Sequence, residues 1–119
     1  MKYMLLVYQE ENALNEEERA HCYVDSSKLC HDLNAAGKYV DAAPLHPVAT
    51  ATSVRVRDGK RLVTDGPFAE TREQLGGFFL VNAKDLDEAL SIAARIPGAK
   101  AGTVEVRPVM EMAGLPDKM

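Results

Sequence analysis

The chain has 119 residues, of which 46% are hydrophobic and 27% charged, and its formal net charge is −4 at pH 7. This length suits one domain with its own core. Because the balance is acidic and the basic residues are scattered, the composition argues against nucleic acid or an anionic membrane as a partner. No apolar stretch approaches the roughly 18 residues of a membrane span, and no signal-peptide pattern is present, so we expect a soluble protein of the cytoplasm.

The first part of the chain predicts a strand, a helix and a second strand. Residues 2–8 are apolar or aromatic at nearly every position, which is typical of a strand covered on both faces. Asn15 precedes three glutamates, a pattern that predicts a helix start. The helix should end near Gly37. A strand is then expected over residues 39–45, before Pro47 limits further pairing.

The expected helix has an inward arc of apolar and small residues. Its members are Cys22, Ser26, Leu29, Cys30, Leu33 and Ala36. The two cysteines lie eight residues apart, or about 12 Å along a helix, which is too far for a disulfide. His21 and Asp25 share one helix face, but no third ligand converges with them and His31 faces away, so we expect neither a metal nor a cofactor.

The middle of the chain carries the clearest local signal. Asp58-Gly59 separates two alternating segments, residues 52–57 and 60–64, and this predicts a β-hairpin with a two-residue turn. The Thr71 and Gln74 pair matches a capping box for a short helical turn.

The last third predicts a strand, a helix and a strand. The strand covers residues 78–81, the helix 85–96 and the final strand 104–110. The helix should face inward with Leu86, Ala89, Leu90 and Ala93. Without the hairpin, the order is the βαββαβ unit of ferredoxin-like α+β folds. Two strands are apolar on both faces, so a homodimer would cover the face that the helices leave open. The domain should span residues 1–112, with a tail over 113–119.

A long motif runs through the centre of the chain. It reads Val54-Arg55-Val56-Arg57-Asp58-Gly59, then Leu62-Val63-Thr64-Asp65-Gly66-Pro67-Phe68-Ala69-Glu70-Thr71, then Glu73-Gln74-Leu75-Gly76-Gly77-Phe78. It resembles the DGPF branch of the YCII-related family, and the similarity covers most of the chain outside residues 10–40. The resemblance implies a dimeric α+β barrel whose two sheets enclose a shared interior. Members of the wider family are regarded as candidate enzymes, some with a suggested His–Asp pair.

The DGPF segment, Asp65 to Phe68, has two interpretations. In the structural one, Asp65, Gly66 and Pro67 form a turn and nothing more. In the functional one, Asp65 and Glu70 line the barrel mouth and Phe68 forms an apolar wall. A carboxyl group in such a poorly solvated cleft can exchange protons near neutral pH. Asp65 would then be the acid or base. Glu70 or Gln74 would orient the substrate, and Gly66, Pro67 and Phe68 would contact it.

His46 is the third candidate catalytic residue. It lies between Leu45 and Pro47, where a strand should leave the barrel, and it could form a proton-transfer pair with Asp65. A partly exposed loop histidine is the simpler interpretation, because a histidine here is not part of the DGPF pattern.

Three functions remain open from the sequence, and the third and weakest of them is a stand-alone assembly domain with no ligand. The first is a homodimer that binds a small organic molecule in its barrel, with cofactor-free acid–base chemistry through Asp65. The second is a non-catalytic regulatory or protein-interaction module. In that case the DGPF segment is structural, and the hairpin residues Arg55, Arg57 and Lys60 or a sheet edge meet another protein.

Overall fold

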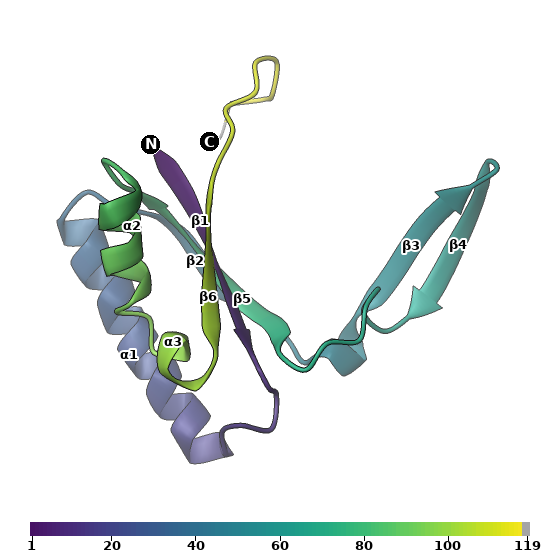
Figure 1. The fold of residues 1–119 in the computed structure, drawn as a ribbon, viewed down its shortest axis with the longest axis horizontal. Helices are drawn as coiled ribbons and strands as arrows, with labels where there is room; N and C mark the ends of the chain where they lie inside the picture. Colours follow the sequence, from purple (N-terminus) through teal and green to yellow (C-terminus); the bar gives the residue numbers. More distant parts are fainter. Residues whose placement is uncertain (118–119) are drawn as a thin grey trace.

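The structure is a computed structural model that describes residues 1–117. Four strands form one antiparallel sheet in the order β2-β5-β1-β6, with the helices on one face (Figure 1). The elements are β1 (Lys2–Gln9), α1 (Glu16–Ala35), β2 (Tyr39–Pro44), η1 (Val48–Thr50), β3 (Thr52–Arg57), β4 (Lys60–Asp65), β5 (Gln74–Asn82), α2 (Leu86–Ala93), α3 (Gly98–Ala101) and β6 (Thr103–Pro108). Without β3 and β4 this is the ferredoxin-like order, so the predicted fold class is confirmed.

Helix α1 begins where the sequence predicts. The Asn15 side chain accepts a hydrogen bond from the Glu18 backbone N–H at 2.8 Å, and the Glu18 carboxylate accepts one from the Asn15 N–H at 3.0 Å. This capping box satisfies two backbone donors at the helix start. The helix ends at Ala35, and Gly37 then adopts a φ of +73° that favours glycine.

The core lies between the helices and one face of the sheet. Its buried residues are Tyr3, Leu5, Leu29, Leu33, Phe79, Val81, Ala83, Ala89, Ile92, Ala93 and Ile96. Because side chains alternate along a strand, Met4 and Leu6 of β1 and Phe78 and Leu80 of β5 point to the other face. These four residues form what we call the open sheet face, which no helix covers (Figure 1).

Helix α2 corrects one expectation. Leu86 and Leu90 were expected to face inward, but they are 50% and 47% exposed. The buried residues of α2 are instead Ala89, Ile92 and Ala93, so the buried side of the helix includes Ile92 and excludes both leucines. The two alanines let the helix approach the sheet closely, so the larger leucines fall outside the contact.

The start of β5 corrects a second expectation. Thr71 and Gln74 do not form a helical capping box. The Thr71 hydroxyl donates to the Glu73 carbonyl at 2.6 Å, and Gln74 is the first residue of β5. Gln74 pairs with Gln9 of β1, so ladder pairing extends the strand four residues before the predicted start at residue 78. Pairing with a distant strand overrides this local pattern.

The β3–β4 hairpin forms as predicted. Asp58 and Gly59 have φ values of +51° and +73°, as a two-residue turn of this kind requires. At the base of the hairpin, the Ser53 hydroxyl donates to the Gly66 carbonyl at 2.8 Å, and the Gly66 N–H donates to the Ala51 carbonyl at 2.7 Å. The hairpin is a separate two-stranded sheet that projects away from the four-stranded one (Figure 1).

Of the tail predicted over residues 113–119, Lys118 and Met119 lie outside the described residues. Within residues 1–117, no helix has the length and apolar character needed to span a membrane.

Candidate functional site

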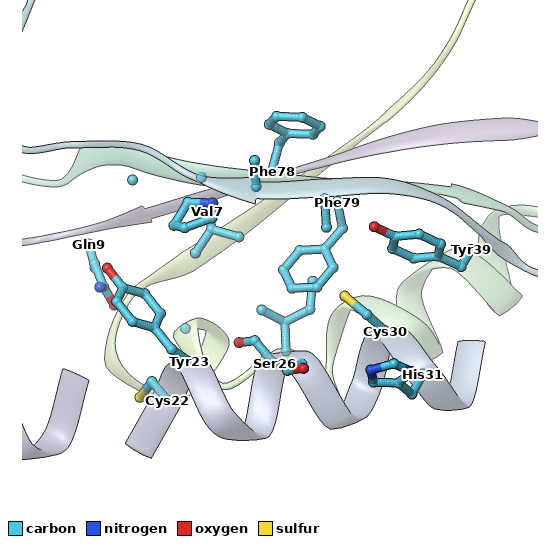
Figure 2. A pocket seen from close by; sticks show the side chains of 18 of the residues that line it. Val7, Gln9, Cys22, Tyr23, Ser26, Cys30, His31, Tyr39, Phe78 and Phe79 are labelled. Atoms are coloured by element: carbon cyan, nitrogen blue, oxygen red, sulfur yellow. The ribbon is translucent and has the colours of Figure 1, made fainter. Parts of the chain in front are cut away.

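A cavity of about 520 Å³ lies between α1 and the helix-covered face of the sheet (Figure 2). This volume is within the range of small-molecule sites. Helix α1 provides one wall through Cys22, Tyr23, Ser26, Ser27, Cys30, His31 and Asn34. The sheet provides the other through residues that include Val7, Gln9, Tyr39, Ala42, Ala43, Pro44, Gly76, Gly77 and Phe79, and Ile96 and Gly98 close it.

The cavity arises from small residues that face one another. Along α1, Cys22, Ser26 and Cys30 follow at intervals of four residues, so all three lie on the side of the helix that borders the cavity. The sheet opposite them is also lined by small residues: Ala42, Ala43, Gly76 and Gly77. Leu29 and Leu33 are buried beside this row and hold the helix at a distance from the sheet. The small side chains therefore leave space that larger ones would fill.

Polar groups gather at both ends of the cavity. Figure 2 shows Gln9 and Tyr23 at one end, Tyr39 and Cys30 at the other, and the ring of Phe79 extending down from the sheet between them. Among the described residues that line the cavity, none is Asp, Glu, Lys or Arg. The interior therefore suits a neutral molecule, because an ion would lose its hydration there without a charged partner.

Gln9 contributes an unsatisfied acceptor to this site. Its side-chain oxygen Oε1 is buried and has no hydrogen-bond partner within residues 1–117. A buried acceptor in this state destabilises a protein by about 1–3 kcal/mol. A hydroxyl or N–H group of a bound ligand would remove this penalty.

Two of the residues that line the cavity, Cys30 and His31, carry side chains that enzymes use in catalysis. Burial raises the pKa of the Cys30 thiol, so this group stays protonated at neutral pH and is a poor nucleophile. His31 is exposed at the rim, beside Cys30 (Figure 2). Imidazole is the side chain used most often for proton transfer in enzymes.

The residues predicted from the DGPF segment lie elsewhere. None of the seven predicted site residues, all of which the structure describes, lines the cavity. Asp65 ends β4 and is exposed, as is Glu70, and Phe68 is 80% exposed rather than set against a wall. Gly66 and Pro67 are half-buried in the turn at the hairpin base. A catalytic or ligand-binding role for this segment stays a prediction.

His46 and Gln74 lie nearer to the cavity. Gln74 pairs directly with the cavity residue Gln9, and directly paired residues project to the same face of a sheet. The Leu45 N–H donates to the carbonyl of the cavity residue Gly76 at 2.8 Å, and His46 follows as an exposed residue. Within residues 1–117, no hydrogen bond or ion pair joins His46 to the Asp65 carboxylate.

The helix residues considered as metal ligands are also located. His21 and Asp25 approach to 3.7 Å on the outer side of α1, and Cys22 and Cys30 are both free thiols. In the described part of the chain, no three His, Cys, Asp or Glu side chains gather as metal ligands would.

Comparisons with known proteins give a family and a fold. The pattern of the YCII-related domain matches residues 1–113. A protein of Rhizobium meliloti (strain 1021), called Uncharacterized protein R00369, is 40% identical over 114 residues, which cover 92% of each chain. Among solved structures, 5-chloro-2-hydroxyhydroquinone dehydrochlorinase (TftG) from Burkholderia phenoliruptrix AC1100, in complex with 2,5-dihydroxybenzoquinone, is similar with a TM-score of 0.57. It is 16% identical, and the similarity covers 94% of this chain and 96% of TftG, which shows a shared fold.

Proposed function

Because the chain belongs to the YCII-related family and encloses a cavity of about 520 Å³, we propose that it binds a small, neutral, largely apolar organic molecule between α1 and the sheet. The observation that carries this proposal is the lining itself. It combines aromatic rings and small side chains with a few uncharged polar groups, as small-molecule sites commonly do.

The geometry narrows the ligand further. Tyr23, Tyr39 and Phe79 offer ring faces and edges to a planar molecule. The unpaired Oε1 of Gln9 calls for a hydrogen-bond donor on that molecule. A hydroxylated aromatic compound of one or two rings meets both requirements. The 2,5-dihydroxybenzoquinone bound to TftG, the protein of similar fold, is likewise a flat six-membered ring with two hydroxyl groups, although a quinone ring is not aromatic.

Proton transfer without a cofactor is the reaction that we propose for this site. His31 lies at the cavity rim, and its imidazole is suited to move a proton to or from a bound phenol or quinone. Asp65, the acid–base residue predicted from the DGPF segment, lies outside the cavity of its own subunit. It would serve such a reaction, with Glu70 beside it, only if a second subunit brought it to the site.

A protein-interaction module is the second candidate function. One observation favours it: the hairpin carries Arg55, Arg57 and Lys60 on an exposed surface that projects from the rest of the chain (Figure 1). An interaction role and a ligand cavity are compatible, because they use different parts of the molecule.

The test compares two serine variants. Ser26 points from α1 into the cavity, so Ser26→Phe should fill part of it, whereas Ser91→Phe places the same ring on the exposed side of α2. Titration calorimetry with hydroquinone should give equal binding to the wild type and Ser91→Phe. Binding to Ser26→Phe should be at least about tenfold weaker, since a blocked contact of about 1.4 kcal/mol has that effect. Equal binding to all three proteins would place the ligand elsewhere and refute the proposed site.

A further inference from the structure

The cavity between α1 and the sheet is larger than a single aromatic ring needs. Its volume of about 520 Å³ equals that of about 17 molecules of liquid water at about 30 Å³ each. Each water molecule has one non-hydrogen atom, so the cavity has room for a ligand with at least about 17 such atoms. Hydroquinone, with one ring and two hydroxyl groups, would leave roughly half of this space empty, and protein interiors contain few such voids.

The two walls of the cavity are also long. On α1 the lining residues extend from Cys22 to Asn34, which is about 18 Å along a helix axis. On the sheet, β2 lines the cavity from Tyr39 to Pro44, which is about 17 Å along a strand. Both walls are much longer than one six-membered ring. A ligand that contacts both ends of the cavity is therefore elongated.

One end of the cavity is suited to a hydroxyl group. Gln9 and Tyr23 lie there (Figure 2), and the buried Oε1 of Gln9 has no hydrogen-bond partner in the described part of the chain. Gly98 closes this end. A Cβ atom on Gly98 would lie 2.6 Å from Cγ1 of Val7 and 3.8 Å from Oε1 of Gln9. Because Gly98 has no side chain, the space beside the acceptor stays open to a ligand hydroxyl that donates its hydrogen.

The other end of the cavity is polar as well, and the middle is apolar. Figure 2 shows Tyr39 at the far end, with Cys30 and His31 on the helix below it. The Tyr39 hydroxyl can donate or accept a hydrogen bond, so this end suits either a hydroxyl or a carbonyl group. Between the two ends, the ring of Phe79 and the side chain of Val7 line the cavity with carbon atoms. A ligand that matches this lining is apolar in its middle and polar at both ends.

We propose, resting on the function proposed above, that the cavity takes an elongated aromatic molecule of at least two fused rings with an oxygen-bearing group at each end. One hydroxyl group of this ligand donates to Oε1 of Gln9. The fused rings lie against Phe79, and the oxygen at the far end bonds to the Tyr39 hydroxyl. Hydroquinone is then a partial ligand, which the Gln9 end holds alone.

The experiment compares three ligands by titration calorimetry on the full chain. Naphthalene-2,6-diol has two fused rings with a hydroxyl group at each end, naphthalen-2-ol lacks one of these hydroxyl groups, and hydroquinone lacks one ring. The wild type should bind the diol at least about tenfold more tightly than hydroquinone, because the second ring buries further apolar surface. It should bind the diol about fivefold more tightly than naphthalen-2-ol, because only the diol makes a hydrogen bond at both ends.

A pair of tyrosine variants then tests the far end. Tyr39→Phe removes one hydroxyl group from the cavity, so it should weaken binding of the diol about fivefold and leave hydroquinone binding unchanged. Tyr8→Phe is the matched control. The Tyr8 hydroxyl donates to the Glu105 carboxylate at 3.3 Å, and Tyr8 does not line the cavity, so this variant should bind all three ligands as the wild type does.

Two results would overturn the elongated ligand. One is equal affinity of the wild type for the diol and for hydroquinone, and the other is a Tyr39→Phe variant that binds the diol as tightly as the wild type does. If Ser26→Phe still weakens hydroquinone binding in either case, the cavity remains the ligand site and only the elongated ligand is wrong. A wild type that binds none of the three compounds would refute both this inference and the proposed function.

Discussion

The two faces of the four-stranded sheet differ in how far their apolar side chains are buried. Leu5 and Phe79 point toward the helices and are buried, whereas their neighbours Leu6 and Phe78 point the other way and stay partly exposed. Both faces are apolar, but the chain provides helices for one of them only (Figure 1). The helix-covered face therefore holds the chain together and borders the cavity, whereas the other face is equally apolar but has no helix over it.

The largest expected effect comes from a pair of adjacent leucines. Leu5→Ala should lower the free energy of unfolding by about 3 kcal/mol, because it leaves a cavity at a fully buried position. Leu6→Ala changes the same residue type one position along, on the open sheet face. Urea unfolding at several protein concentrations separates them, since only a loss at a subunit contact depends on concentration. Equal, concentration-independent losses in both variants would break the comparison between the two faces.

Most of the fold could be predicted because its signals are local. Asn15 with its following glutamates marks a helix start, and Asp58-Gly59 marks a hairpin, through hydrogen bonds and dihedral angles within a few residues. The sequence-based prediction was wrong at the start of β5, where pairing with a strand that is distant in sequence determines the secondary structure. Gln74 is a strand residue because it pairs with Gln9, which is remote in sequence, and the local pattern around Thr71 does not contain that information.

The cavity was missed for a related reason. The sequence placed Cys22, Ser26 and Cys30 on the inward arc of α1, and the structure places Gly76 and Gly77 of β5 across the cavity from that arc. Small residues on both sides of one contact are the signal that could have indicated an internal space. Whether such a space stays open depends on how Leu29, Leu33 and the sheet hold the helix, which is a property of packing rather than of any one segment.

The next prediction concerns Gln9, which lines the cavity on the helix-covered face. It tests whether this face binds a ligand as well as forming the core. Gln9→Leu removes the buried unpaired acceptor, so it should raise the free energy of unfolding by about 1 kcal/mol. The same change should weaken hydroquinone binding about tenfold, because a hydrogen bond to the ligand is lost. Calorimetry and urea unfolding on one preparation measure both effects.

The control for Gln9→Leu is the ligand rather than a second variant. The dimethyl ether of hydroquinone has no donor, so the wild type and Gln9→Leu should bind it equally well. A variant that loses affinity for the ether as strongly as for hydroquinone would show that the leucine alters the cavity shape. Binding of hydroquinone that Gln9→Leu leaves unchanged would remove the hydrogen bond from the proposal.

The smallest expected effect concerns an ion pair on the helix-covered side of the sheet. It tests whether this side differs from the hairpin β3–β4 in its ion pairs as well as in its packing. Lys38 Nζ lies 2.9 Å from Glu88 Oε2, which ties the start of β2 to α2, whereas no ion pair ties the hairpin β3–β4 to the rest of the described chain. The hydrogen bond from Lys38, followed by one from the Lys84 backbone N–H, lowers the pKa of Glu88 below its ordinary value of 4.5.

A group whose pKa is lowered by folding contributes stability above its unfolded pKa, and that contribution is lost as the pH falls through the folded value. The free energy of unfolding, measured in urea between pH 7 and pH 3, should therefore decline below about pH 4.5, and Glu88→Gln should flatten part of that decline. Asp87→Asn, one position earlier on the exposed side of α2, should leave the decline as it is in the wild type. Because the pair is partly exposed to solvent, added salt should reduce the Glu88 effect. An acid decline that is the same in both variants would mean that the helix-covered side relies on packing alone.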